Sequence, residues 1–223
     1  MHLAESSRPA ASPLAAPVLS AAGYAHLVKF IYTESGIALG PEKQYLLESR
    51  LLPIIRQEQI ASLDALATLL MGKPSSSLRR LVVEAMTTHE TLFFRDPVMF
   101  EALRKEVMPG LFGKLSGGRK LRIWSAAASS GQEAYSLAML ALELGKDASD
   151  VEILGTDLST QVLERAREGT YGTFEIGRGV SSSLLLRYFD KKGSDSQIKE
   201  HVRRMVRFEQ RDLRADVAAL GAC

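Results

Sequence analysis

The chain has 223 residues, 46% of them hydrophobic and 24% charged, which suits a globular protein of one large or two small domains. A net charge of +2 excludes a strong bulk attraction to nucleic acid or to a membrane surface. The single cysteine, Cys223, excludes an internal disulfide, and no apolar run approaches the ~20 residues that span a bilayer. We therefore expect no nucleic-acid partner, no membrane insertion and no metal site.

Residues 23–86 predict a small all-α domain, preceded by a tail, residues 1–22, that is rich in Ala, Ser and Pro and is expected to be disordered. Ser62 is a candidate N-cap, Pro41 suits a first helical turn, and Pro53 is expected to kink or break the second helix. Four apolar stripes at helical spacing carry this prediction: Leu27, Phe30 and Ile31; Leu47, Leu51, Ile54 and Ile55; Leu63, Leu66, Leu69 and Leu70; Leu78, Leu81, Val82 and Ala85.

From Thr87 onward, strand and helix patterns alternate, which predicts an α/β domain, residues 87–223, with a parallel sheet. Strands are expected at 121–124, 153–157 and 205–208, and helices at 98–107, 134–143, 161–167 and 184–188. Pro109 and Gly110 are expected to lead out of the first of these helices toward a turn at 116–118.

The sequence at 124–136 is WSAAASSGQEAYS, which places a loop of tiny residues between a strand and a helix. Small side chains from Ala126 to Gly131 let backbone N–H groups approach a ligand closely. The loop therefore predicts a ligand site, with a tight turn that binds nothing as the alternative. It lacks the full G-x-G-x-x-G pattern, which counts against a dinucleotide.

Asp157 ends the next strand, about 20 residues after this loop. A carboxylate in that place can accept hydrogen bonds from both hydroxyls of a ribose, although an ordinary helix N-cap is the alternative. The loop and Asp157 together predict a site for a nucleoside cofactor.

Two further segments allow both a functional and a structural interpretation. In TTHETLFFR, residues 87–95, Phe93 and Phe94 suit the wall of an apolar pocket and Arg95 suits carboxylate binding, whereas a core aromatic pair beside a surface arginine is the alternative. His89 by itself is expected to be a structural hydrogen-bonding group. After the last strand, Asp212 either reaches an adenine or caps a helix at 216–220.

Together these motifs resemble the CheR family of chemotaxis receptor methyltransferases, over residues 27–213. The motifs that carry the resemblance are TTHETLFFRD at 87–96, WSAAASSGQE at 124–133 and GTDLS at 155–159. It implies a small all-α domain followed by a Rossmann-like α/β methyltransferase domain in a cytoplasmic, monomeric enzyme. It also implies that S-adenosylmethionine (SAM) donates a methyl group to glutamates on the cytoplasmic helices of chemoreceptors, leaving S-adenosylhomocysteine (SAH).

The resemblance implies residue roles as well. Arg95 would be the catalytic residue, Glu133 would contact the methionine end of the cofactor, and Asp157 would hold the ribose. His89 stands where some family members carry Asn, and Asp212 where Asn is usual, which keeps an acceptor and loses an amide donor. The implied cofactor-binding residues are His89, Thr91, Arg95, Ala126, Glu133, Asp157, Leu158, Asp212 and Leu213, the last two near the adenine.

In the family, the helical domain meets acidic receptor helices through a basic helix. The matching segment here, residues 41–56, offers Lys43, Arg50 and Arg56 as receptor-binding candidates, with a solvated face as the alternative.

The family fold continues past the position of Cys223 with a strand that leads to an Asn and, shortly after it, a Tyr beside the cofactor. The resemblance therefore implies an incomplete sheet and weak activity, and it places any receptor-tethering subdomain after this point. A SAM-binding regulatory module and a methyltransferase for another substrate are the alternative functions.

Overall fold

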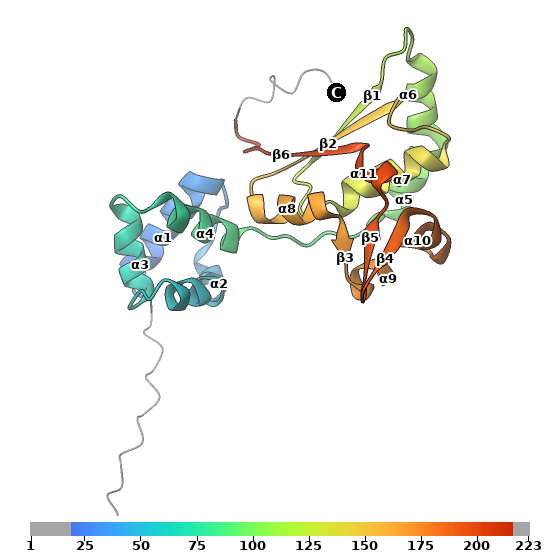
Figure 1. The fold of residues 1–223 in the computed structure, drawn as a ribbon. Helices are drawn as coiled ribbons and strands as arrows, with labels where there is room; N and C mark the ends of the chain where they lie inside the picture. Colours follow the sequence, from blue (N-terminus) through green and yellow to red (C-terminus); the bar gives the residue numbers. More distant parts are fainter. Residues whose placement is uncertain (1–18, 216–223) are drawn as a thin grey trace, which may run out of the picture. The chain divides into compact units, whose positions relative to one another are not determined.

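The computed structural model describes residues 19–215, which form two compact units divided between Met86 and Thr87 (Figure 1). The division coincides with the boundary expected from the change in sequence pattern. The first helix begins at Ala21, slightly before the start expected for the helical domain, and Ser20 caps it by accepting a hydrogen bond from the N–H of Gly23 at 3.0 Å.

Within residues 19–86, the helices of the first unit pack their apolar stripes around one core. Leu27, Leu47 and Leu51 have no exposed surface. Ser62 is the N-cap expected from the sequence, since its hydroxyl accepts from the N–H of Ala65 at 3.1 Å. The elements are α1 (Ala21–Ser35), the 3-10 turn η1 (Pro41–Lys43), α2 (Gln44–Gln57), α3 (Leu63–Met71) and α4 (Ser76–Met86).

Helix α2 runs through Pro53 without a break, so of the two expected outcomes, a kink or a break, the break is wrong and the kink stays a prediction. Proline removes the hydrogen bond that its amide would give to the carbonyl four residues earlier, here that of Ser49. Ser49 and Pro53 are both exposed, and the freed carbonyl therefore faces water instead of a dry core.

The described part of the second unit contains a parallel sheet of three strands in the order β1-β2-β6 (Figure 1). The strands are β1 (Leu121–Ala126), β2 (Val151–Asp157) and β6 (Val206–Gln210), joined in register with Leu121 opposite Val151 and Ile153 opposite Val206. Helices α7 (Gln132–Glu143) and α8 (Thr160–Glu168) follow β1 and β2, and the sheet lies above both helices in the view of Figure 1. Parallel strands end at one edge of a sheet, so Ala126, Asp157 and Gln210 meet there. A further strand after residue 223 stays a prediction.

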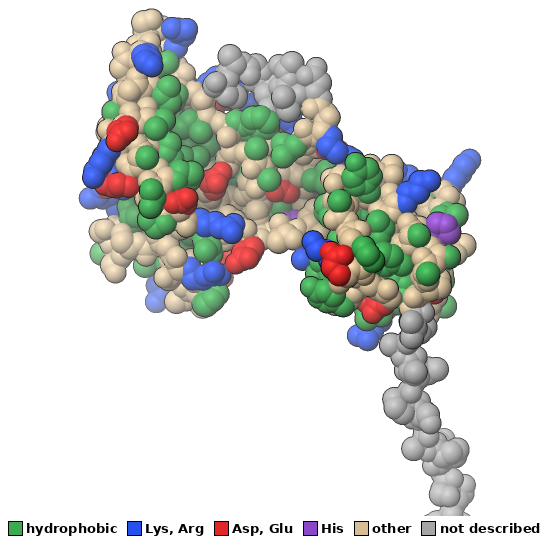
Figure 2. Space-filling model, turned by 180° about the vertical axis from the view of Figure 1, so that it is seen from behind, with side chains coloured by type: hydrophobic (Ala, Val, Ile, Leu, Met, Phe, Trp, Pro, Cys, Tyr) green, Lys and Arg blue, Asp and Glu red, His purple; other side chains and the backbone are tan. Residues whose placement is uncertain are grey.

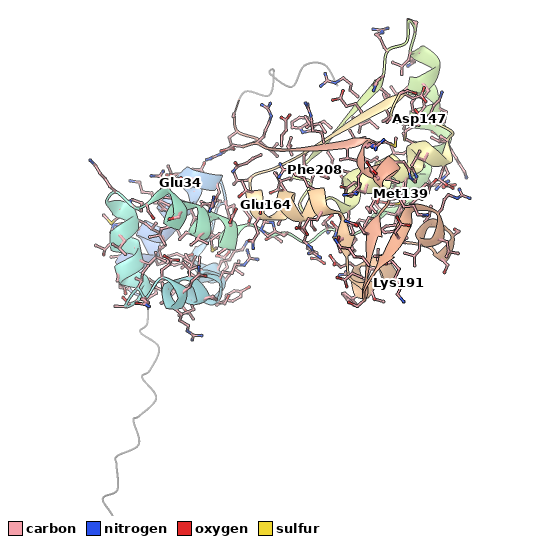
Figure 3. All side chains as sticks on the ribbon, viewed as in Figure 1. Glu34, Met139, Asp147, Glu164, Lys191 and Phe208 are labelled. Atoms are coloured by element: carbon pink, nitrogen blue, oxygen red, sulfur yellow. The ribbon has the colours of Figure 1, made fainter. Side chains whose placement is uncertain are left out.

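The aromatic ring of Phe208 fills the space between the sheet and α7. A Cβ atom on Gly155 would lie 2.6 Å from this ring and one on Gly131 would lie 2.9 Å from it, so the ring needs both glycines. Gly131 also has a left-handed backbone, with φ of 92°. Phe208 and Met139, both labelled in Figure 3, belong to the same buried cluster. The Phe208 ring therefore packs under the loop between β1 and α7 and supports it from the core side.

A second, antiparallel sheet was not expected from the sequence. Its strands are β3 (Thr170–Tyr171), β4 (Phe189–Lys192) and β5 (Asp195–Ile198), in the order β3-β5-β4, with Lys191 of β4 labelled in Figure 3. Helices α9 (Thr173–Gly177) and α10 (Ser182–Tyr188) lie between β3 and β4 in the chain, and α10 confirms the helix expected at 184–188. The short helix α11 (Glu200–Arg203) leads from β5 to β6.

The helix expected to end at residue 107 continues to Lys114, so that boundary is wrong. It consists of α5 (Pro97–Ala102), the π-helical turn η2 (Leu103–Val107) and α6 (Met108–Lys114). The N–H of Met108 donates to the carbonyl of Leu103, one residue further back than in an α-helix. This wider turn shifts the bonding pattern just before Pro109, whose missing N–H then falls at the start of α6. The turn expected at 116–118 is present, with φ of 69° at Gly117 and Gly118.

Among residues 19–215, no helix combines the length and apolar character that crossing a membrane requires.

Candidate cofactor site

The carboxylate of Asp157 is held by two backbone amides at the edge where the parallel strands end. The N–H of Ser129 donates to Oδ2 at 2.8 Å, and the N–H of Ser159 donates to Oδ1 at 3.0 Å. Each oxygen keeps a lone pair for another donor, which suits the paired hydroxyls of a ribose. The N-cap of α8 is Ser159, whose hydroxyl accepts from Val162, so Asp157 itself is not that cap.

The small-residue loop wraps around this carboxylate with a strained backbone. Ala127 and Ser129 have φ of 57° and 50°, in the left-handed region that non-glycine residues rarely adopt. Such conformations persist only where the surroundings impose them, and they gather at binding sites. The bonds from the loop to Asp157 and to the carbonyl of His89, which accepts from the hydroxyl of Ser129 at 2.9 Å, supply that restraint.

Glu133, in the first turn of α7, is fixed in a similar way. The buried hydroxyl of Ser125, on β1, donates to Oε1 of Glu133 at 2.7 Å. Among residues 19–215, no other group bonds this carboxylate, so Oε2 is available for a donor from a ligand. The carboxylate therefore has a set position beside the loop.

A cavity of about 480 Å³ opens beside Glu133, within the volume range of small-molecule sites. It brings together three residues that the resemblance placed in the site, namely Thr91, Arg95 and Glu133. The full lining is Glu90, Thr91, Leu92, Arg95, Asp96, Pro97, Met99, Phe100, Ala127 and Glu133.

Comparison with known proteins decides the family. The model of the CheR methyltransferase SAM binding domain matches residues 89–222, and that of the CheR methyltransferase all-alpha domain matches residues 22–87. This chain belongs to the CheR methyltransferase family. It is thus a SAM-dependent methyltransferase of chemotaxis, with an all-α domain followed by a SAM-binding domain.

Three relatives illustrate the similarity. Chemotaxis protein methyltransferase 1 of Pseudomonas aeruginosa is 45% identical over 198 residues, which cover 86% of this chain and 72% of that protein. Chemotaxis protein methyltransferase Cher2 of Pseudomonas putida is 42% identical over the same shares of both chains. The chemotaxis protein methyltransferase of Vibrio parahaemolyticus is 37% identical over 89% of this chain and 73% of that protein.

In this CheR protein, Arg95 is the exposed cation of the cavity. Within the described part of the chain, its guanidinium has no hydrogen-bond or ion-pair partner. It is therefore available to a carboxylate, and its exposure also fits the alternative of a surface arginine, so carboxylate binding by Arg95 stays a prediction.

Phe93 has the structural role that the alternative interpretation gave it. Its ring has no exposed surface and packs edge-on against Tyr171 and Phe189, with ring centroids 4.9 Å and 5.7 Å away. The ring of Phe94 packs on that of Phe100, with 5.0 Å between the centroids. The apolar wall of the cavity comes instead from Leu92, Met99 and Phe100, because burial of Phe93 turns its ring into the core.

His89 acts as a structural group. Its Nε2 lies 2.7 Å from the hydroxyl of Thr87, and its carbonyl receives the bond from Ser129. A contact of His89 with the cofactor stays a prediction. Ala126 ends β1 with an exposed side chain, and the neighbouring Ala127 is the alanine that lines the cavity.

The residues expected near the adenine lie at the same sheet edge as Asp157. The N–H of Arg211 donates to the carbonyl of Asp157 at 2.9 Å, and the side chain of Gln210 donates to the carbonyl of Leu158 at 3.0 Å. The carboxylate of Asp212 pairs with Arg214 at 2.6 Å, and these bonds hold the pKa of Asp212 below its usual range. Leu213 is half exposed. The helix expected at 216–220 lies outside the described residues.

The receptor-binding candidates of the first unit separate into two kinds. Lys43 and Arg56 are exposed. Arg50 is half-buried and donates to the carbonyls of Met86 at 2.8 Å and Ala85 at 3.5 Å, at the end of α4. A cation there satisfies helix carbonyls that have no intrahelical partner, so Arg50 has a structural role in addition to any contact with a receptor.

Sequence reasoning missed Tyr171 and Glu175. The hydroxyl of Tyr171 donates to the carbonyl of Ser130 in the loop, and the side-chain amide of Gln132 donates to Glu175. Burial raises the pKa of Tyr171 well above its usual value, so the phenol keeps its proton and remains a donor. The only sequence signal was an aromatic residue between Gly169 and Gly172 directly after a helix, which is a weak one.

Proposed function

We propose that this CheR protein is a protein-glutamate O-methyltransferase that methylates chemoreceptors during chemotactic adaptation. The observation that carries the proposal is one cavity lined by an arginine with no described partner, Arg95, and by a carboxylate of set position, Glu133. A methyl donor with an amino-acid end and a nucleoside end fits this site. Its amino-acid end would meet Glu133 at the cavity, and its nucleoside end would meet Asp157 at the adjoining end of the sheet.

The proposed cofactor contacts follow from the acceptors that remain free. Glu133 would accept from the amino group of SAM, and Asp157 from its ribose hydroxyls. Leu158 would lie beside Asp157 at the ribose, and Asp212 and Leu213 would lie near the adenine. Two separately held carboxylates, one on α7 and one at the end of β2, favour a ligand with two separate donor groups, which supports SAM over a smaller amine.

When bound, SAM supplies an electrophilic methyl group on a positively charged sulfur. A substrate glutamate, with a pKa of about 4.3 in water, is already ionised at neutral pH, so the protein needs no general base. Arg95 would hold the glutamate so that one carboxylate oxygen points at the methyl carbon. One C–O bond forms, the C–S bond breaks with its electron pair left on sulfur, and the products are a glutamate methyl ester and SAH.

The partly apolar wall of the cavity suits this reaction. The negative charge of the carboxylate and the positive charge of the sulfonium both disappear as the methyl group moves. A dry site therefore destabilises the separated ions more than the transition state. Leu92, Met99 and Phe100 supply the apolar part of the lining, and Arg95 would orient the nucleophile.

Recognition of the receptor is proposed to involve the all-α domain. Lys43 and Arg56 are exposed cations on and beside α2, which suits a partner with acidic helices. On the face seen in Figure 2, acidic and basic side chains are interspersed over both units. Electrostatic steering would therefore be weak and sensitive to salt.

Methyl transfer to receptor-containing membranes tests the proposal. The purified chain is mixed with SAM labelled in its methyl group and with membranes that contain chemoreceptors, and the label is followed in receptor and in volatile methanol after alkaline hydrolysis. We expect alkali-labile label in the receptor, and Arg95→Ala should lose it. The Kd of this variant for SAH distinguishes a lost orientation of the glutamate from a lost contact with the cofactor. Alkali-stable label would contradict a glutamate ester, and SAH binding without any transfer would indicate a binding module.

A further inference from the structure

The segment that carries Arg95 contains a strained backbone position. Phe94, directly before Arg95, has φ of 49°, in the left-handed region that a bulky residue rarely adopts. A conformation of this kind persists only where the surrounding structure imposes it. The residues that impose it therefore decide where Arg95 points.

One restraint comes from α7. The N–H of Phe94 donates to the hydroxyl oxygen of Ser136 at 3.0 Å. That hydroxyl donates its own proton to the carbonyl of Gln132 at 2.7 Å, and Ser136 has no exposed surface. The direction of the hydroxyl is thus fixed, and its lone pair is aimed at Phe94.

A second restraint comes from the loop between α9 and α10. A Cβ atom on Gly179 would lie 1.9 Å from the carbonyl oxygen of Phe93 and 2.8 Å from its carbonyl carbon. These are backbone atoms and cannot rotate away as the end of a flexible side chain would. The ring of Phe93 is itself fixed between Tyr171 and Phe189, so the segment has no room to retreat.

We propose that Gly179 and Ser136 are positioning residues that hold Phe93 and Phe94 in the conformation that directs Arg95 into the cavity. The guanidinium of Arg95 has no described partner to hold it, so its placement depends on the backbone before it. The inference rests on the proposed function of Arg95. The restraint on Phe94 can be measured without catalysis.

The chain offers a closely matched pair of variants. In Gly179→Ala the new methyl group meets the backbone of Phe93, whereas in Gly177→Ala it meets no atom within 4 Å. Both are the same chemical change in the same short stretch of chain, and neither glycine has a positive φ. Ser136→Ala removes the other restraint, the hydrogen-bond acceptor for the N–H of Phe94, without adding an atom.

Hydrogen exchange at the amide of Phe94 gives the first measurement. We expect exchange at least about tenfold faster in Gly179→Ala and in Ser136→Ala, and unchanged in Gly177→Ala, because the amide loses its fixed acceptor or its fixed geometry. Unchanged exchange in both of the first two variants would overturn the proposal. If Gly179→Ala does not fold, Ser136→Ala alone decides by the same criterion.

Kinetics give the second measurement. We expect kcat to fall about 100-fold in Gly179→Ala, since a displacement of about 1 Å can have that effect on an aligned reaction, while the Kd for SAH changes by less than about threefold. A purely structural role would lower the melting temperature without separating kcat from SAH affinity. Equal kcat in Gly179→Ala and Gly177→Ala would overturn the inference. Absence of methyl transfer by the unaltered chain would contradict the proposed function instead, and the exchange result would still judge the restraint.

Discussion

The phenolic hydroxyl of Tyr171 donates a 2.7 Å hydrogen bond to the backbone carbonyl of Ser130. Tyr171 lies on β3 of the antiparallel sheet, and Ser130 lies in the small-residue loop that holds Asp157. Both residues are buried, so the bond is formed away from water. The antiparallel sheet therefore supports the loop of the cofactor site through this bond. None of its three strands provides a residue to the cavity lining.

We expect Tyr171→Phe to weaken SAH binding about threefold to tenfold and to lower the free energy of unfolding by about 1–2 kcal/mol. The carbonyl of Ser130 would be left buried without its donor, which has a free-energy cost of this order. Calorimetry with SAH and denaturant unfolding measure the two effects. Tyr188→Phe is the control, because the hydroxyl of Tyr188 bonds Glu143 outside the site. An SAH affinity lowered equally in both variants would contradict a local effect on the loop.

Asp157→Asn is expected to weaken SAH binding about 100-fold, equivalent to about 2.7 kcal/mol. Both carboxylate oxygens accept from backbone amides, of Ser129 and Ser159, and an asparagine would turn an NH₂ group toward one of these donors. Calorimetry gives the affinity. Asp190→Asn, on an exposed carboxylate of β4, is the control and should bind SAH normally. Normal affinity in Asp157→Asn would exclude Asp157 as the ribose acceptor.

The sequence predicted those elements of the fold that have strong apolar periodicity. Helices α1 to α4 each bury a regular stripe, such as Leu47, Leu51 and Ile54 in α2, and the parallel strands were predicted from short apolar runs that alternate with helices. The antiparallel sheet could not be predicted in this way, since its strands are short and polar. Asp190 and Lys191 of β4 are exposed, and β3 has only two residues. One buried residue per strand, Tyr171, Phe189 and Ile198, packs this sheet on the core, which is too few for a periodic pattern.

In the candidate site, the sequence predicted which residues lie at the ends of the parallel strands, but it did not predict where their neighbours' side chains point. Asp157 and the loop before α7 were predicted because parallel strands bring their carboxyl ends together. The direction of the Phe93 ring depends on Tyr171 and Phe189, which come much later in the chain. Arg50 likewise meets the last carbonyls of α4, a contact that no local pattern signals. The orientations of Phe93 and Arg50 therefore depend on contacts between segments that are distant in the sequence.

The two kinds of cation in the all-α domain predict different effects. Lys43→Ala and Arg56→Ala should raise KM for receptor membranes about twofold to fivefold, an effect that shrinks as salt is added, because exposed charges act over a Debye length of about 8–10 Å. Arg50→Ala should instead lower the stability of this domain by about 1–2 kcal/mol, because it leaves the carbonyl of Met86 without its donor. Receptor methylation at two salt concentrations and thermal unfolding measure the effects. A stability loss in Lys43→Ala equal to that in Arg50→Ala would contradict the division.

The second unit contains an ion pair that predicts sensitivity to acid. The hydroxyl of Tyr188 donates to Glu143 at 2.5 Å, and Arg187 pairs with the same carboxylate. The Tyr188 hydrogen bond first, and Arg187 after it, hold the pKa of Glu143 below its usual value. A carboxylate with a lowered pKa in the folded state stabilises the fold above its unfolded pKa of about 4.3, and this contribution is lost as the pH falls through the folded value.

Glu143→Gln should therefore lower the free energy of unfolding by about 1 kcal/mol at pH 7, a modest figure because Arg187 is largely exposed to solvent. The difference from the unaltered chain should shrink as the pH falls below the unfolded pKa of about 4.3 and through the lower pKa of the folded Glu143. Denaturant unfolding from pH 7 to pH 3 measures it. Glu164→Gln, on the exposed face of α8 and labelled in Figure 3, is the matched control and should show little change at any pH. A difference between Glu143→Gln and the unaltered chain that stays constant across this range would show that packing, and not the charge of Glu143, carries the effect.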